Sequence, residues 1–181
     1  MRAPPLPSAD VDASGRVYVA WAGCQTREAC DATDIVMATS PDGITWTPSA
    51  RVPTRNPGDR TAQFVPGLAV DPASSGPTAR LAIAYYSLRE PNGCAVSDCA
   101  GLNVSVIQSG NGGRTWGRPQ RLSAQPMHVS WIADGGIGGM VGDYISSSWV
   151  GGLPVPVFSL ASEPSGFDLQ RQAIFAGVHL G

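Results

Sequence analysis

The chain has 181 residues and a formal net charge of −2, so it carries no basic field that would attract nucleic acid or an anionic membrane. Only 14% of the residues are charged, whereas the 22 glycines and 16 prolines are typical of a turn-rich β protein. No apolar stretch approaches the roughly 20 residues of a membrane-spanning helix, and residues 1–7 lack the apolar core of a signal peptide.

The first part of the chain predicts four short strands, at residues 7–12, 16–21, 34–39 and 50–53. Between the third and fourth of these lies the turn Ser40–Trp46, with the sequence SPDGITW. Its Ser and Asp side chains can hydrogen-bond nearby backbone amides, and Gly43 can adopt the positive φ of a tight hairpin. No segment of ten or more residues has helical periodicity, which favours an all-β fold.

The same order of elements recurs about seventy residues later, which indicates a repeat architecture. The second set of predicted strands covers residues 64–71, 80–87, 102–108 and 120–123. Its turn, Ser109–Trp116, reads SGNGGRTW and has Asn111 where the first turn has Asp42.

A third repeat is present with three predicted strands, at residues 140–149, 153–160 and 169–175. Pro154 and Pro156 predict that its second strand lies at an edge or contains a bulge, because proline cannot donate to a sheet ladder. The chain therefore reads as two complete four-stranded units and most of a third.

The four cysteines occupy matching positions in the first two repeats. Cys24 and Cys30 follow the second strand of the first repeat, and Cys94 and Cys99 follow the second strand of the next. Three pairings are possible, and the matched placement favours the two local disulfides. A zinc site is the alternative, but the two histidines lie far away in sequence, and no metal site is expected.

The two turns resemble the Asp box, the Ser-x-Asp-x-Gly-x-Thr-Trp (BNR) repeat of sialidases and related bacterial β-propellers. The resemblance extends over nearly the whole chain and is closest to secreted actinobacterial proteins of the exo-sialidase-like group. It implies a single partial propeller over residues 1–181, about half of a six-bladed ring, with blades near residues 4–55, 62–125 and 128–181. It also implies structural roles for the turn residues, with both tryptophans packed into the blades: Ser40, Asp42, Gly43, Trp46, Ser109, Asn111, Gly113 and Trp116.

Asp143 and Tyr144 are the best candidates for catalytic residues, since the first strand of each blade lines the channel of a propeller. Sialidases use a Tyr nucleophile assisted by a Glu, a separate Asp acid/base and three arginines that bind the substrate carboxylate, so the resemblance implies Tyr144 as the nucleophile and Asp143 as the acid/base. Adjacent strand residues face opposite ways, however, so the two side chains would not flank one bond. The alternative is that both are structural polar residues facing the channel.

Two functions remain open at this point. The first is an extracellular glycoside hydrolase related to sialidases, which would act on glycans when the propeller is complete. The second is a non-catalytic propeller module that binds glycan or protein. The expected partners are extracellular glycan and either the remaining blades of a longer chain or a second copy. No cofactor is expected, and the paired cysteines favour a secreted protein.

Overall fold

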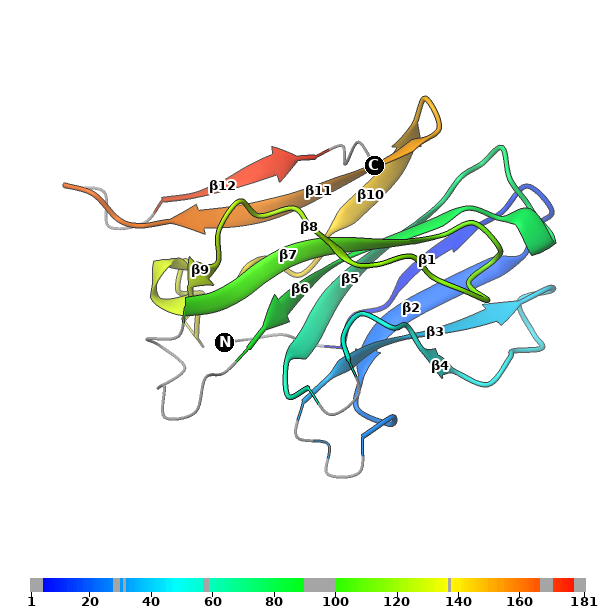
Figure 1. The fold of residues 1–181 in the computed structure, drawn as a ribbon, viewed down its shortest axis with the longest axis horizontal. Helices are drawn as coiled ribbons and strands as arrows, with labels where there is room; N and C mark the ends of the chain where they lie inside the picture. Colours follow the sequence, from blue (N-terminus) through cyan, green and yellow to red (C-terminus); the bar gives the residue numbers. More distant parts are fainter. Residues whose placement is uncertain are drawn as a thin grey trace.

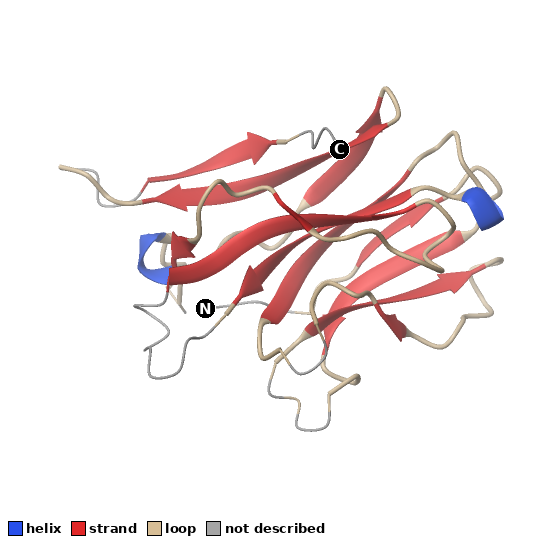
Figure 2. Cartoon of the chain, viewed as in Figure 1, coloured by secondary structure: helices blue, strands red, loops and turns tan. Residues whose placement is uncertain are grey.

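The computed structural model describes residues 5–27, 30, 32–56, 59–89, 100–136, 138–166 and 171–177. These residues form an all-β protein of three antiparallel sheets, with sheet 2 between sheets 1 and 3 (Figure 1). Short 3₁₀ turns at Gly76–Thr78 and Val129–Trp131 are the helical segments of this part of the chain (Figure 2).

Sheet 1 is a four-stranded meander in the order β1-β2-β3-β4. It contains β1 (Ser8–Val11), β2 (Val17–Gly23), β3 (Asp34–Ser40) and β4 (Ala50–Arg51). Side chains along β2 alternate between buried and partly exposed, as expected of a strand with one face toward a core. The four strands lie within one or two residues of the positions predicted from the sequence.

Sheet 2 repeats this meander and adds a short strand. It contains β5 (Ala62–Val70), β6 (Leu81–Leu88), β7 (Ala100–Ser109), β8 (Gln120–Arg121) and β9 (Met127–His128), which pairs with β7. β5 is buried along almost its whole length because the other two sheets cover both of its faces. The sequence predicted β5 to β8 but not β9.

Sheet 3 contains β10 (Ser146–Val150), β11 (Leu153–Ser162) and β12 (Arg171–Ala176). The prediction of a strand from residue 140 was wrong, because the backbone becomes extended and paired only at Ser146. Pro154 and Pro156 lie inside β11, each opposite a residue of β10. The Pro156 carbonyl accepts from Gly177 N (3.1 Å) on the side away from β10, so the missing proline N–H groups leave the β10 ladder intact.

The first strands of the three sheets lie side by side and are joined by side-chain hydrogen bonds. Ser8 Oγ and Asp10 Oδ2 of β1 accept from Leu68 N (2.9 Å) and Val70 N (2.7 Å) of β5. Ser147 Oγ of β10 donates to the Gly67 carbonyl of β5 (3.1 Å). β5 is therefore the central strand to which both neighbouring sheets attach.

Two apolar clusters fill the spaces between the sheets. The cluster between sheets 1 and 2 includes Tyr18, Ile35, Leu68, Leu81 and Ile83. The cluster between sheets 2 and 3 includes Phe64, Tyr86, Leu102, Met127, Ile145 and Phe158. Tyr86 also links its two sheets, since its hydroxyl donates to the Ser159 carbonyl (2.8 Å) and accepts from Ser159 N (2.9 Å), and burial raises its pKa to about 12.

The two predicted turns are built alike. In the first, Ser40 Oγ accepts from Gly43 N (2.8 Å), and Asp42 Oδ1 accepts from Ile44 N (2.8 Å) and Thr45 N (2.7 Å). These backbone donors, Thr45 and Ile44, lower the pKa of Asp42 to about 2.

In the second turn, Ser109 Oγ accepts from Gly113 N (3.0 Å) and Asn111 Oδ1 accepts from Thr115 N (2.9 Å). An amide oxygen thus replaces a carboxylate oxygen without loss of the turn. Gly43 (φ 75°) and Gly113 (φ 83°) have positive φ angles, which explains why glycine occupies both positions.

The tryptophans of the two turns differ in their packing. Trp116 packs against the cluster between sheets 1 and 2, as predicted. The expectation that Trp46 is packed into the fold was wrong, because its side chain is 44% exposed. It lies with Val19, Trp21 and Ala38 on the outer face of sheet 1, which no other sheet in the described part of the chain covers.

Cys24 and Cys30 form a disulfide, with Cα atoms 4.9 Å apart, in the loop between β2 and β3. Cys94 and Cys99, for which a second disulfide was predicted, lie outside the described residues.

Candidate functional site

Asp143 and Tyr144 lie on a short irregular segment directly before β10, not on a strand. Val141 and Ile145 on either side are buried in the cluster between sheets 2 and 3 and fix both ends of the segment. Gly142 has φ +121°, a conformation that favours glycine, and it turns the chain between the two anchors. The fold therefore holds Asp143 and Tyr144 in place although neither belongs to a sheet.

The segment lies against an irregular part of β5. The pairing of β5 with β6 shifts between Phe64 and Gly67, and Val65 within this bulge has φ +49°, a strained value for a β-branched residue. A side chain on Gly67 would lie 2.6 Å from the Ile145 carbonyl oxygen, so only glycine permits this approach. The bulge and the glycine together bring the Asp143–Tyr144 segment onto β5.

The two side chains differ in their exposure to solvent. Tyr144 is 71% exposed, whereas the Oδ1 atom of Asp143 is buried and has no hydrogen-bond partner among the described residues. In this part of the chain, no arginine and no second carboxylate pairs with Asp143. Strand alternation, on which the prediction of opposite-facing side chains rested, does not apply here, because both residues lie in an irregular segment.

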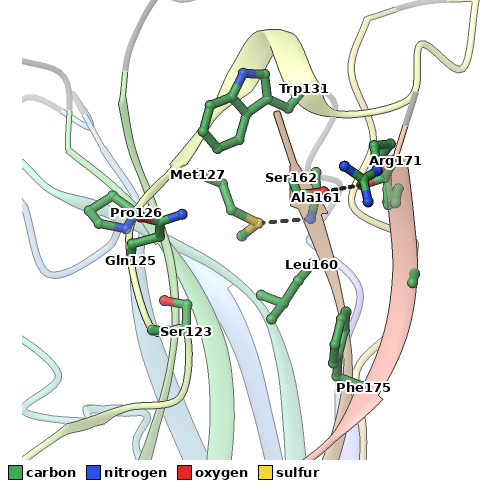
Figure 3. A pocket seen from close by; sticks show the side chains of 13 residues that line it. Ser123, Gln125, Pro126, Met127, Trp131, Leu160, Ala161, Ser162, Arg171 and Phe175 are labelled. Carbon is green, nitrogen blue, oxygen red and sulfur yellow. Dashed lines mark hydrogen bonds between the residues drawn. The ribbon is translucent and has the colours of Figure 1, made fainter. Parts of the chain in front are cut away.

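A cavity of about 490 Å³ lies between the β8–β9 segment of sheet 2 and strands β11 and β12 (Figure 3). Trp131, Met127, Leu160 and Phe175 form its apolar walls, and Arg171 of β12 lies at one side. Met127 Sδ accepts from Ala161 N (3.1 Å), which joins the two walls. The cavity can receive the apolar face of a ligand, and Arg171 is the one cation among its described lining residues.

A second, more polar groove of about 600 Å³ lies between sheets 1 and 2 and is here called the arginine groove. Its walls carry three arginines: Arg51 and Arg55 come from sheet 1 and its following connection, and Arg118 comes from the segment before β8. This groove could not be predicted from the sequence, because the arginines of its two walls are 63 or more residues apart and share no motif.

A buried ion pair forms the base of this region. Asp34, the first residue of β3, has no exposed surface, and it accepts from Arg55 Nε (2.8 Å), Arg55 Nη2 (3.1 Å) and Arg27 Nη2 (3.0 Å). Burial alone would raise the pKa of Asp34, but the bonds from Arg55, Thr26 and Arg27 outweigh it and lower the pKa. Arg55 is thus held in place and is not free to bind a ligand through these atoms.

One sequence signal near both sites was overlooked. Gly58-Asp59-Arg60 and Gly142-Asp143-Tyr144 are the same Gly-Asp-x motif, and each Asp lies three residues before the first strand of its sheet. Asp59 Oδ1 accepts from Thr61 N (3.0 Å) and Thr61 Oγ1 (2.7 Å). Aligning the repeats on their first strands would have placed the two acids at equivalent positions.

The described residues contain no group of three or more His, Cys, Asp or Glu side chains able to hold a metal ion. None of the helices in this part of the chain is long and apolar enough to cross a membrane.

No family model and no curated protein matches the sequence. Solved structures with a similar fold include the Hadza microbial sialidase Hz136, with a TM-score of 0.59 and 15% identity. The match covers 97% of this chain and 34% of the sialidase. They also include Zg3597, a family 117 glycoside hydrolase of the marine bacterium Zobellia galactanivorans, with a TM-score of 0.52 and 18% identity. That match covers 97% of this chain and 51% of Zg3597. The chain is therefore similar in fold to glycoside hydrolases and spans about a third to a half of their length.

Proposed function

We propose that this chain is part of a sialidase-like β-propeller with Asp-box turns. Its ligands are extracellular glycans, which the chain binds but does not cleave by itself. The three sheets are consecutive blades whose first strands, β1, β5 and β10, line the channel. The side-by-side arrangement of these strands and the two matching turns support this assignment. The disulfide between Cys24 and Cys30 supports a secreted location.

One observation carries the non-catalytic part of the proposal: Asp143, with a buried carboxylate oxygen, and the exposed Tyr144 have no arginine or carboxylate partner among the described residues. Retaining glycoside hydrolysis needs two groups on opposite sides of one bond. A lone tyrosine without an acid/base opposite it does not supply them.

A second function is that of a glycoside hydrolase whose site is completed by further blades. The fixed Val141–Ile145 segment favours it, because a segment held at both ends can present Asp143 and Tyr144 to a substrate. The partner groups would then come from the blades that complete the ring.

Hydrolysis of a fluorogenic sialoside by the purified 181-residue chain separates these functions. We expect no release above a heat-denatured control, and no difference between the chain and its Tyr144→Phe variant, since loss of the paired groups typically removes many decades of rate. Release that Tyr144→Phe abolishes would contradict the non-catalytic function. A panel of neutral and anionic oligosaccharides in a binding assay tests the glycan-directed part, and failure to bind any of them would contradict it.

A further inference from the structure

Strand β12 forms one side of sheet 3, and no strand of the described residues pairs with its outer edge. Sheets 1 and 2 differ, because β4 and β8 cover the same edge of β3 and β7. The bond from Gly177 N to the Pro156 carbonyl shows which groups of β12 are paired, since successive residues of a strand turn their backbone groups to alternate sides. Ile174 and Ala176 therefore turn their N–H and C=O groups toward the uncovered edge.

In sheets 1 and 2 the same edge receives an aliphatic residue of the fourth strand. Val52 N donates to the Ile35 carbonyl (2.8 Å). Leu122 N donates in the same way to the Val104 carbonyl (2.8 Å). Ile35 and Val104 have no exposed surface, whereas Ile174, the aliphatic residue in the middle of β12, is 71% exposed. An edge with unpaired backbone groups and exposed apolar side chains is a template for another strand.

The cavity between sheets 2 and 3 is lined in part by β12 itself (Figure 3). Leu160 of β11 and Phe175 of β12 form part of its wall, and Phe175 is 46% exposed. The groove between sheets 1 and 2 has one more wall, formed by residues 116–119, which lead into β8. Trp116 of that wall packs against the cluster between sheets 1 and 2. Among the described residues, no such segment covers the cavity between sheets 2 and 3.

The two segments that supply the fourth strands share a sequence pattern. Residues 46–52 and 116–122 each contain a tryptophan, four variable residues, an arginine and then valine or leucine. In both sheets the arginine lies opposite the residue that follows the bonded carbonyl. In sheet 3 that position is Phe175, whose exposed ring can attract a guanidinium group.

We propose that the outer edge of β12 and the cavity beside it bind an extended polypeptide segment with the pattern Trp-x4-Arg-Val/Leu, supplied from outside these 181 residues. The backbone of the segment would pair with Ile174 and Ala176. Its arginine would lie over Phe175, and its tryptophan would enter the cavity beside Leu160. Glycan binding plays no part in this assignment, which follows from comparison of the three sheets.

Fluorescence anisotropy of the labelled peptide TWGRPQRLSA, which has the sequence of residues 115–124, tests the edge with the purified 181-residue chain. We expect saturable binding of one peptide per chain. A peptide of the same composition in scrambled order should bind at least about tenfold more weakly, because its arginine and tryptophan no longer meet Phe175 and the cavity. Methylation of the backbone nitrogen of the peptide's leucine should have the same effect, since that nitrogen would donate to the Ile174 carbonyl.

Two variants and a control locate the bound peptide. Ala176→Pro removes an outward N–H of β12 without removing a bond to β11, and Phe175→Ala removes the ring beneath the arginine. Each is expected to weaken binding at least about tenfold. Val150→Ala is the control, because Val150 is exposed on β10 of the same sheet but lies at neither the edge nor the cavity. It should bind the peptide as the parent chain does. If Ala176→Pro lowers the melting temperature, the methylated peptide tests the same edge on the parent chain.

Equal binding of the peptide to the parent and to both variants would place it elsewhere and overturn the inference. Equal binding of the scrambled peptide would also overturn it, because attraction would then need no matching strand. No binding of the 115–124 peptide overturns the inference and leaves the proposed glycan binding untouched. A second copy of the chain at the edge would appear as peptide affinity that falls as the chain concentration rises, and would contradict a segment from outside the chain.

Discussion

Asp34 shows how one side chain can join distant parts of this chain. It has no exposed surface, and its arginine partners come from the disulfide loop, at Arg27, and from the connection between sheets 1 and 2, at Arg55. Both guanidinium groups are themselves more than nine-tenths buried. Removing the acid would leave two like charges in a region that water does not reach freely.

Replacement of Asp34 by alanine is therefore expected to lower the free energy of unfolding by about 3–5 kcal/mol, the usual effect of leaving a buried charge unpaired. Urea denaturation followed by tryptophan fluorescence measures it. The Arg121→Gln variant is a suitable comparison, because exposed Arg121 donates to the Ala124 carbonyl (3.1 Å), forms no ion pair among the described residues and should contribute less than about 0.5 kcal/mol. Equal stability of Asp34→Ala and the parent chain would contradict the assigned ion pair.

Three aspartates are expected to make the stability of the fold sensitive to acid. Burial tends to raise the pKa of Asp12, but bonds from Ser14, Gly76 and Arg16 lower it to about 2, and the pKa values of Asp34 and Asp42 are also lowered. A carboxyl with a lowered folded-state pKa stabilises the fold above its unfolded value of 3.8, and this stabilisation is lost as pH falls through the folded value. We expect the melting temperature to fall between pH 4 and pH 2, where the unfolded chain binds more protons.

The second turn, Ser109–Trp116, supplies a natural control for this acid effect. Asn111 holds its turn with the same acceptor geometry and no charge. The Asp42→Asn variant should therefore keep the turn but lose its share of the decline in melting temperature toward pH 2. A decline identical to that of the parent, measured by circular dichroism, would show that the Asp42 turn does not contribute.

At the scale of elements, the attachment of sheet 3 depends on a close contact. A Cβ atom at Gly67 would meet both the backbone oxygen and the side chain of Ile145 at 2.6 Å. Gly67→Ala should destabilise the chain by about 1–3 kcal/mol, because β10 and the Asp143–Tyr144 segment must move away from β5. Gly110→Ala is the matched control, since nothing lies within 4 Å of its added methyl and its φ is not positive. Equal thermal unfolding of both variants would contradict the contact.

The strands and turns of the fold were predictable because they depend on local rules. Short apolar runs between glycine, proline and serine predicted β1 to β8, and the side chains of Ser40 and Asp42 predicted the first turn with its hydrogen bonds. The start of sheet 3 was misplaced because Val141 and Ile145 read as strand residues, whereas they are anchors of an irregular segment.

The sites were harder to predict, since they depend on which sheets meet. Arg51 and Arg118 share one groove only because sheets 1 and 2 pack together, and no spacing in the sequence shows this. Trp46 follows the same turn motif as Trp116 but remains exposed, because no neighbouring sheet among the described residues covers it. Local patterns give the strand content, whereas packing between sheets decides exposure.

At the scale of the whole molecule, the outer faces of sheets 1 and 3 carry exposed apolar side chains that nothing covers in the described structure. On sheet 1, Val19, Trp21 and Trp46 border a hollow of about 390 Å³. On sheet 3, Val150, Val157 and Ile174 are exposed, with Ile174 at 71%. Uncovered apolar faces of this kind mark interaction surfaces in soluble proteins.

We expect a second copy of the chain to cover these faces, with the outer face of sheet 1 of one chain against the outer face of sheet 3 of another. Two such contacts related by a twofold axis place six sheets in a closed ring, a number that propellers accept. The Trp46→Gln variant is expected to weaken this assembly. Ile44→Gln is its control, since Ile44 is more exposed but lies on the turn and not on the face.

Multi-angle light scattering of the purified 181-residue chain tests most directly whether the outer faces of sheets 1 and 3 are interfaces. The sheet packing described here predicts a dimer that dissociates on dilution and is weakened by Trp46→Gln but not by Ile44→Gln. A monodisperse monomer that melts cooperatively at all concentrations would contradict the account, because it would show that the outer faces of sheets 1 and 3 need no partner.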